Sequence, residues 1–228
     1  MNKTDSNTQK FHPQVIWSKG TALKGNRSKM LRNKVAQEAA QLLYTSQEKE
    51  YKQAKQRAAE TLGARGLPSN FEVAQELDRI AEEIEGPQRR ELLLRMRKEA
   101  KEIMETVKEF SPCLVGSVWR GTARKNSDID VHVFCQDHIQ VVEKLQKQNY
   151  KIGSSELRSV TKAGNKESSF HIHVILQSRD GVEIVVRSPE HLGQEERCET
   201  YGDVKAGLNL NQLARTLKEN PLQKFVPT

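Results

Sequence analysis

Two aspartates, Asp128 and Asp130, lie two residues apart at the start of an alternating apolar stretch that runs to Phe134. Residues two apart on a β-strand point to the same face and lie about 7 Å apart along it. Carboxylates placed in this way repel each other unless a cation lies between them. Their hard oxygen ligands suit Mg²⁺, which takes further ligands from water and from substrate phosphates. The spacing therefore predicts a metal-dependent phosphoryl or nucleotidyl transfer site.

A Gly-Ser turn, Gly116-Ser117, precedes the aspartates. Glycine lacks a Cβ, so the backbone can approach a ligand closely, and backbone N–H groups together with a hydroxyl can bind a phosphate tail. An ordinary turn is the alternative interpretation. Arg120 could reach the same phosphates, or it could lie exposed on a helix surface. Trp119 could stack on a base or pack in the core.

These residues resemble the nucleotidyltransferases of the DNA polymerase β superfamily, and most of all the minimal prokaryotic members. The resemblance rests on the Gly-Ser-x-x-Arg-Gly pattern at 116–121 and the Ser-Asp-x-Asp pattern at 127–130. It is looser over the wider region 111–192. It implies that Gly116, Ser117 and Arg120 bind the nucleotide and that Asp128 and Asp130 hold the metal.

In the family, a third carboxylate on a neighbouring strand completes the site. Glu183, within the otherwise apolar run 182–186, is the candidate here. A carboxylate in such a run needs a partner or a metal. The chain departs from the family pattern at this point, because many relatives carry Asp. Counting back from Pro189 could align that Asp with Val185 instead.

The resemblance implies two Mg²⁺ ions, for which Mn²⁺ could substitute, and a nucleoside triphosphate, with ATP as the expected one. The ions would neutralise phosphate oxygens during in-line attack on the α-phosphorus, and pyrophosphate would leave. The acceptor hydroxyl could belong to RNA, to a small molecule or to a protein. An alternative is an antitoxin-type or nucleic-acid-binding interaction protein with the same fold.

Three histidines could lie near the predicted site. His132 shares a strand face with the two aspartates, and His171 and His173 share a face on the strand expected to pair with that of Glu183. A His-x-His pair can bind zinc, but the sequence shows no further ligands at a recognisable spacing. Packing, or a polar lining of the cleft, is the expected role.

Positive charge is concentrated at the amino terminus. The chain of 228 residues has a formal net charge of +7, and residues 1–35 hold eight Lys or Arg against the single acid Asp5. The arm could be a solubilising tail, or it could hold RNA through salt-sensitive phosphate contacts.

The sequence pattern, together with the resemblance, predicts three regions. They are a basic, largely irregular arm at 1–27, a helical region at 28–110 and a nucleotidyltransferase domain at 111–228 that ends in a short helix. Apolar residues at helical spacing indicate about four helices in the second region. In the third, β-type stretches alternate with one helix near 137–148. The fold class is α+β, with a small mixed sheet covered by helices on one side.

Composition excludes some classes of protein. No apolar run approaches the roughly 18 residues that span a bilayer, and the first ten residues lack the apolar core of a secretory signal. Three scattered cysteines indicate reduced thiols. We therefore expect a cytoplasmic protein without a membrane partner.

Overall fold

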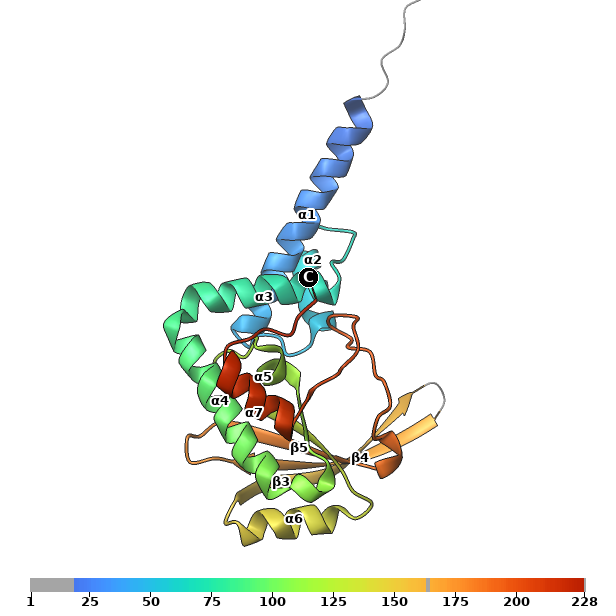
Figure 1. Cartoon of the computed structure of the whole chain (residues 1–228). Helices are drawn as coiled ribbons and strands as arrows, with labels where there is room; N and C mark the ends of the chain where they lie inside the picture. Colours follow the sequence, from blue (N-terminus) through green and yellow to red (C-terminus); the bar gives the residue numbers. More distant parts are fainter. Residues whose placement is uncertain (1–18, 163–164, 228) are drawn as a thin grey trace, which may run out of the picture.

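The computed structural model describes residues 19–162 and 165–227. Its amino-terminal part is a helical unit made of α1 (Lys19–Tyr44), α2 (Tyr51–Leu62) and α3 (Asn70–Glu85). Their core consists mainly of alanines with a few larger side chains, among them Val35, Leu43 and Val73. Small residues let the three helices pack closely. The first half of α1 projects away from the rest of the molecule (Figure 1).

The first helix begins at Lys19, earlier than the predicted start near Ser28. Once a helix is nucleated, each added residue costs little, and Ala22, Leu23 and the lysines of this segment are good helix formers. The two glycines of 19–27 had argued for irregular structure. Residues 1–18 of the predicted basic arm lie outside the described residues.

Local signals set the other helix ends. Gly63 ends α2 in the left-handed conformation, which glycine adopts without a Cβ penalty. Ser69 and Glu72 form a capping box at the start of α3. After Gly86, the helix α4 (Pro87–Thr106) and the short 3₁₀ turn η1 (Lys108–Phe110) lead from the helical unit to the sheet.

A six-stranded mixed sheet forms the second part, in the order β3-β4-β5-β2-β1-β6. Its strands are β1 (Cys113–Val115), β2 (Ile129–Phe134), β3 (Lys151–Lys162), β4 (Asn165–Ile175), β5 (Gly181–Arg187) and β6 (Leu208–Asn209). Among the described strands, β2 and β5 pair in parallel and the other neighbours pair antiparallel. The sequence predicted β-type stretches in this part of the chain, but β6, with two residues, is too short for an alternating pattern.

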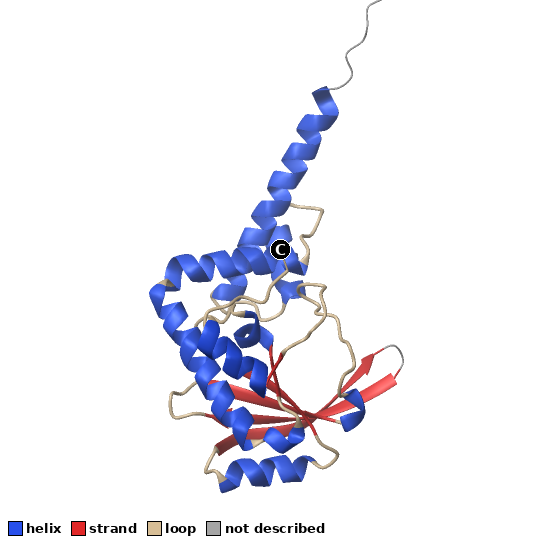
Figure 2. Ribbon diagram, in the orientation of Figure 1, coloured by secondary structure: helices blue, strands red, loops and turns tan. Residues whose placement is uncertain are grey.

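Two short helices and one further turn lie between the strands, and a third short helix follows β6. They are α5 (Gly116–Arg120), α6 (His138–Lys147), the 3₁₀ turn η2 (Pro189–His191) and α7 (Leu210–Glu219). Helices and sheet form separate layers (Figure 2). The helices α4, α6 and α7 contribute Leu93, Leu145 and Leu213 to one core with the strands. The predicted α+β fold, with a small mixed sheet covered on one side, is confirmed.

The sheet therefore has two unlike faces. Ile129, Val131 and Val133 of β2 are fully buried beneath the helices. We call this side the covered face. The alternate residues of the same strand, which include Asp130 and His132, are only partly buried and define the open face. No helix among the described residues is long and apolar enough to cross a membrane.

Candidate active site

The three predicted acidic residues meet at the boundary of β2 and β5. Asp130 lies on β2, and Asp128 comes just before the strand. Because β2 and β5 are parallel, Asp130 and Glu183 are direct neighbours in register. Val185, the alternative third position, pairs with His132 instead. The register therefore brings the carboxylate of Glu183, and not position 185, beside the aspartates.

The electrostatics of the three carboxylates show that they interact. Burial, followed by the charges of Glu183 and Asp128, raises the pKa of Asp130 to about 7. Partial burial, followed by the charge of Glu183, also raises the pKa of Asp128. Like charges in a partly desolvated place favour the protonated form unless a cation compensates them. A divalent ion would supply that compensation, so the donor set fits Mg²⁺ or Mn²⁺ chemically.

Glu183 is at present bound to neighbouring side chains. Its Oε1 lies 2.9 Å from His171 Nδ1 and 3.2 Å from Arg158 Nη1, and 3.6 Å from His173 Nε2. Within the described part of the chain, no three His, Cys, Asp or Glu side chains already converge on one point where an ion could bind. Metal binding would therefore require the Glu183 carboxylate to turn from the Arg158–His171 pair toward the aspartates.

Two glycines provide the space in which the aspartates lie. Gly116 has φ +69°, and a Cβ at this position would clash with Oδ2 of Asp130. A Cβ at Gly181 would likewise clash with Oδ1 of Asp128. The carboxylate of Asp130 thus lies directly against the backbone of the Gly-Ser turn. The two motifs, separate in sequence, therefore lie in contact with each other.

Ser117, the second residue of the turn, borders a cavity of about 220 Å³ between the helical unit and the sheet. Tyr51 and Asp78 line it from α2 and α3, and Arg124 and Tyr201 from the loops of the second part. A larger cavity of about 530 Å³ adjoins Asp128. The helical unit therefore contributes side chains to the surroundings of the predicted site.

Arg120 was predicted to bind nucleotide phosphates, but it is buried and has other partners. Its guanidinium forms a two-pronged ion pair with Asp203, at 3.0 and 2.7 Å, and donates to the carbonyl of Phe225. It also lies between the rings of Trp119 and Tyr201, 4.3 and 4.4 Å from their centroids. Its donors are directed into the protein, so we remove it from the nucleotide-binding set. Trp119 is buried in the core.

Two other buried arginines, which the sequence analysis missed, hold the segment that follows the turn. Arg97 donates to the carbonyls of Val118 and Trp119, at 3.1 and 2.9 Å. Arg89 donates to those of Thr122 and Ala123, at 3.0 and 2.8 Å. Burial lowers the pKa of Arg97 to about 10. Both lie on α4 among surface charges, and nothing in the local pattern distinguishes them from exposed arginines.

The histidines divide into two groups. His132 lies on the open face, and burial, followed by the nearby Arg187, lowers its pKa to about 4. His171 and His173 lie on β4 opposite β5, where His173 pairs in register with Glu183. Both lie near Glu183, and Nε2 of His171 also lies 2.9 Å from Ser169 Oγ. Among the described residues, no group of three or more His, Cys, Asp or Glu side chains could hold a metal ion.

A family profile matches part of the chain. The profile of the nucleotidyltransferase domain matches residues 93–197, from α4 to the loop after η2. A search of curated proteins gave no match.

Several solved structures show a limited likeness. A cytoplasmic RNA terminal U-transferase is 20% identical over 51% of this chain and 34% of its own, with a TM-score of 0.31. A Cid1 poly(U) polymerase variant bound to MgATP is 17% identical over 49% and 38%, with a TM-score of 0.31. The GLD-2/RNP-8 complex gives 14% identity over 54% and 39%, with a TM-score of 0.33. This chain thus covers between 34% and 39% of the length of these structures.

Proposed function

We propose that this chain transfers a nucleoside monophosphate from a triphosphate to an acceptor hydroxyl, through the region 93–197 that the nucleotidyltransferase domain profile matches. The observation that carries the proposal is the contact of Asp130 with two motif residues. Its carboxylate lies against Gly116, and its backbone pairs in register with Glu183. The Gly-Ser turn therefore lies against one carboxylate of the open face, and the neighbouring position on β5 carries a second.

In this proposal, Gly116 and Ser117 bind the β- and γ-phosphates of the incoming triphosphate, with ATP as the expected substrate. Asp128, Asp130 and Glu183 would hold two Mg²⁺ ions, for which Mn²⁺ could substitute. When bound, such ions neutralise phosphate oxygens and favour deprotonation of a hydroxyl. The raised pKa values of Asp128 and Asp130 support this assignment, because carboxylates that repel each other gain most from a cation.

The reaction is a displacement at the α-phosphorus. The acceptor oxygen forms a bond to phosphorus while the bond to the bridging α–β oxygen breaks, and pyrophosphate leaves with that electron pair. Glu183 orients the acceptor hydroxyl, whose proton passes to a carboxylate of the cluster and then to water. Arg158 and His171 hold Glu183 in its present position, so they set how easily it turns toward the aspartates.

The acceptor classes that remain are RNA, a small molecule and a protein. Two of the similar structures are named as an RNA terminal U-transferase and a poly(U) polymerase. We place RNA first among the acceptors to be tested. The amino-terminal basic residues, eight within 1–35, are a proposed phosphate-binding arm.

The test is transfer of label from each α-labelled triphosphate in the presence of Mg²⁺ or Mn²⁺, with RNA and protein acceptors. We expect transfer by the wild-type protein and none by the Asp128→Ala/Asp130→Ala variant. Glu143→Gln, on the exposed surface of α6, is the control and should match wild type. Equal transfer by the double variant would refute the site. A tight complex with a protein or RNA and no transfer would favour the interaction-protein alternative.

A further inference from the structure

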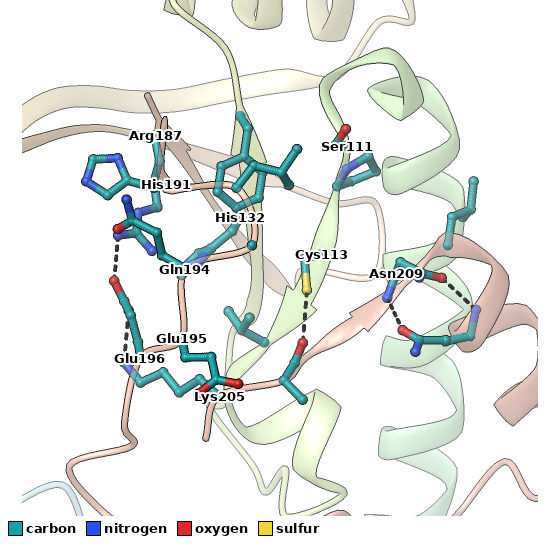
Figure 3. A pocket seen from close by; sticks show the side chains of 18 of the residues that line it. Ser111, Cys113, His132, Arg187, His191, Gln194, Glu195, Glu196, Lys205 and Asn209 are labelled. Atoms are coloured by element: carbon teal, nitrogen blue, oxygen red, sulfur yellow. Dashed lines mark hydrogen bonds and ion pairs between the residues drawn. The ribbon is translucent and has the colours of Figure 1, made fainter. Parts of the chain in front are cut away.

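A cavity of about 730 Å³ lies on the open face, where His132 is one of its lining residues (Figure 3). Its floor comes from three neighbouring strands: Cys113 and Val115 from β1, His132 and Phe134 from β2, and Arg187 from β5. Two stretches of the loop that follows β5, 191–196 and 204–206, form the opposite wall. We call this space the open-face cavity.

Strand register places the open-face cavity relative to the carboxylates. Val115 pairs with Asp130, and one step further along the face Cys113 pairs with His132. His132 and Asp130 are two residues apart on one strand, so their side chains lie on the same face about 7 Å apart. The strand β1 runs in the opposite direction to β2 and ends at Val115, directly before the Gly-Ser turn. Along the strand direction, Asp130 and its neighbour Glu183 therefore lie between the Gly-Ser turn and His132 of the cavity floor.

This arrangement limits the direction from which the acceptor hydroxyl can attack. In phosphoryl transfer, the attacking and leaving oxygens lie roughly in line on opposite sides of the phosphorus. If the leaving pyrophosphate is bound by Gly116 and Ser117, the attacking hydroxyl must approach from the other side of Asp130 and Glu183. The open-face cavity lies on that side.

The lining of the cavity indicates what it could bind. Three cationic side chains, Lys108, Arg187 and Lys205, line it together with two carboxylates, Glu195 and Glu196. Arg187 Nη2 lies 2.5 Å from Glu196 Oε1, and Lys205 Nζ lies 3.9 Å from its Oε2. The lining thus carries one more positive than negative charge, which favours an anionic ligand.

Polar and apolar groups complete the lining. His191 is one of the lining residues, and its Nδ1 is buried without a hydrogen-bond partner among the described residues. Asn209 and Gln194 add amide groups, while Phe134 and Leu192 add apolar surface. Ligand sites commonly enclose about 300–1,000 Å³, with apolar walls and a few placed polar groups. A nucleotide has the matching parts: a flat base, hydroxyls and a phosphate.

We propose that the open-face cavity binds the acceptor, and that the acceptor is a ribonucleotide whose hydroxyl is directed toward Asp130 and Glu183. This inference rests on the proposed transferase function. Such a ribonucleotide could be the 3′ end of an RNA strand or a free nucleoside monophosphate. The experiment distinguishes them.

The test measures binding without any triphosphate, so it does not depend on catalysis. A short 5′-fluorescent oligoribonucleotide is titrated with the full chain, and anisotropy is recorded. We expect Lys108→Glu and Lys205→Glu each to weaken binding about tenfold, since each reverses a charge facing the ligand. Ala206→Leu, which adds bulk to the wall without changing charge, should also weaken binding. Lys147→Glu, on α6 over the covered face, is the matched charge control and should bind as wild type does.

Two further measurements, displacement of the oligomer and transfer of label, show whether the acceptor is an RNA end or a free nucleotide. Displacement of the oligomer by a nucleoside monophosphate, together with labelling of that monophosphate in the transfer assay, would assign a free nucleotide. Resistance to displacement, with transfer lost when the oligomer carries a 3′-phosphate, would assign an RNA end. In the transfer assay, the cavity variants should raise KM for the acceptor and leave KM for the triphosphate unchanged.

Several results would overturn the assignment. They are oligomer binding equal to wild type in all three cavity variants, an equal loss in Lys147→Glu, and failure of the wild-type chain to bind either ligand. Label transfer to a protein but to neither ribonucleotide would also overturn it. If the wild-type chain binds the oligomer through the cavity but transfers nothing, the proposed function fails and the binding site stands.

Discussion

The two faces of the sheet are built from alternate residues of the same strands, yet they serve opposite purposes. On the covered face, Ile129, Val131 and Val133 are fully buried against the helices. On the open face, Asp130 and Glu183 lie side by side with a strongly raised pKa at Asp130. One face gains stability from burial of apolar area. The other holds like charges close together, which costs stability until a cation binds.

The comparison indicates where stability and chemistry can be separated. A side chain and its neighbour in sequence point to opposite faces, so adjacent substitutions should have different consequences. Changes on the open face should reduce activity and leave the fold intact. Changes on the covered face should reduce the free energy of unfolding and leave the chemistry of the folded molecules intact.

The largest expected effect is on the open face. Asp130→Asn removes a charge from the predicted metal site but keeps the shape of the side chain. We expect kcat to fall by about a thousandfold or more, since ion-mediated charge stabilisation contributes several kcal/mol. The thermal midpoint without metal should stay the same or rise, because a repulsive charge is removed. Kinetics and thermal unfolding on the same preparation check both parts. A large drop in Tm would mean that Asp130 has a structural role.

The next effect is on the covered face. Ile184 is fully buried and adjoins Glu183 in sequence. Ile184→Ala should lower the free energy of unfolding by about 2–5 kcal/mol through lost burial and a residual cavity. Denaturant titration measures this change. Activity per folded molecule should remain near wild type at low temperature. Loss of kcat in a fully folded sample would show that the two faces are not independent.

A pair of glycines sharpens the comparison. Gly116 and Gly63 both have positive φ, +69° and +61°, but a Cβ would meet Asp130 only at Gly116. Each Gly→Ala change should cost about 1 kcal/mol of backbone strain. Only Gly116→Ala should also displace the carboxylate, and so lower kcat at least about tenfold. Similar activity of the two variants would show that the close approach of Gly116 to Asp130 is not needed.

The smallest effect is a pH dependence of stability in Mg²⁺-free buffer. The pKa of Asp130 is about 7 in the folded protein, against 3.8 as the ordinary value. The folded state therefore binds the proton more tightly, and stability from this group is present at low pH and is lost as pH rises toward 7. Denaturant midpoints across pH 4–8 should show this slope in wild type, and a smaller one in Asp130→Asn. Saturating Mg²⁺ with a triphosphate should flatten it.

The sequence predicted those features whose signals are local. The Asp-x-Asp spacing and the alternation along β2 each determine their structure within a few residues. The pairing of Glu183 with Asp130 followed from two apolar strands and a family likeness. The alternative, Val185, could be set aside only once the parallel register was known.

Other features depend on partners far along the chain. Arg120 meets Asp203 and Phe225, 83 and 105 residues away, and nothing near position 120 indicates that it is buried. Arg97 binds carbonyls of the carboxyl-terminal segment, at Pro221 and Gln223. The loop that lines the open-face cavity has no periodic pattern. Its residues come together only because β5 and β6 lie on opposite sides of β2 and β1.

Metal binding tests the central claim most directly. Mn²⁺ binding in the presence of a non-hydrolysable triphosphate analogue can be followed by electron paramagnetic resonance, in wild type, in Asp128→Asn/Asp130→Asn and in the surface control Glu143→Gln. The carboxylate site predicts an affinity at least about tenfold lower in the double variant alone. Identical Mn²⁺ isotherms for all three proteins would contradict it.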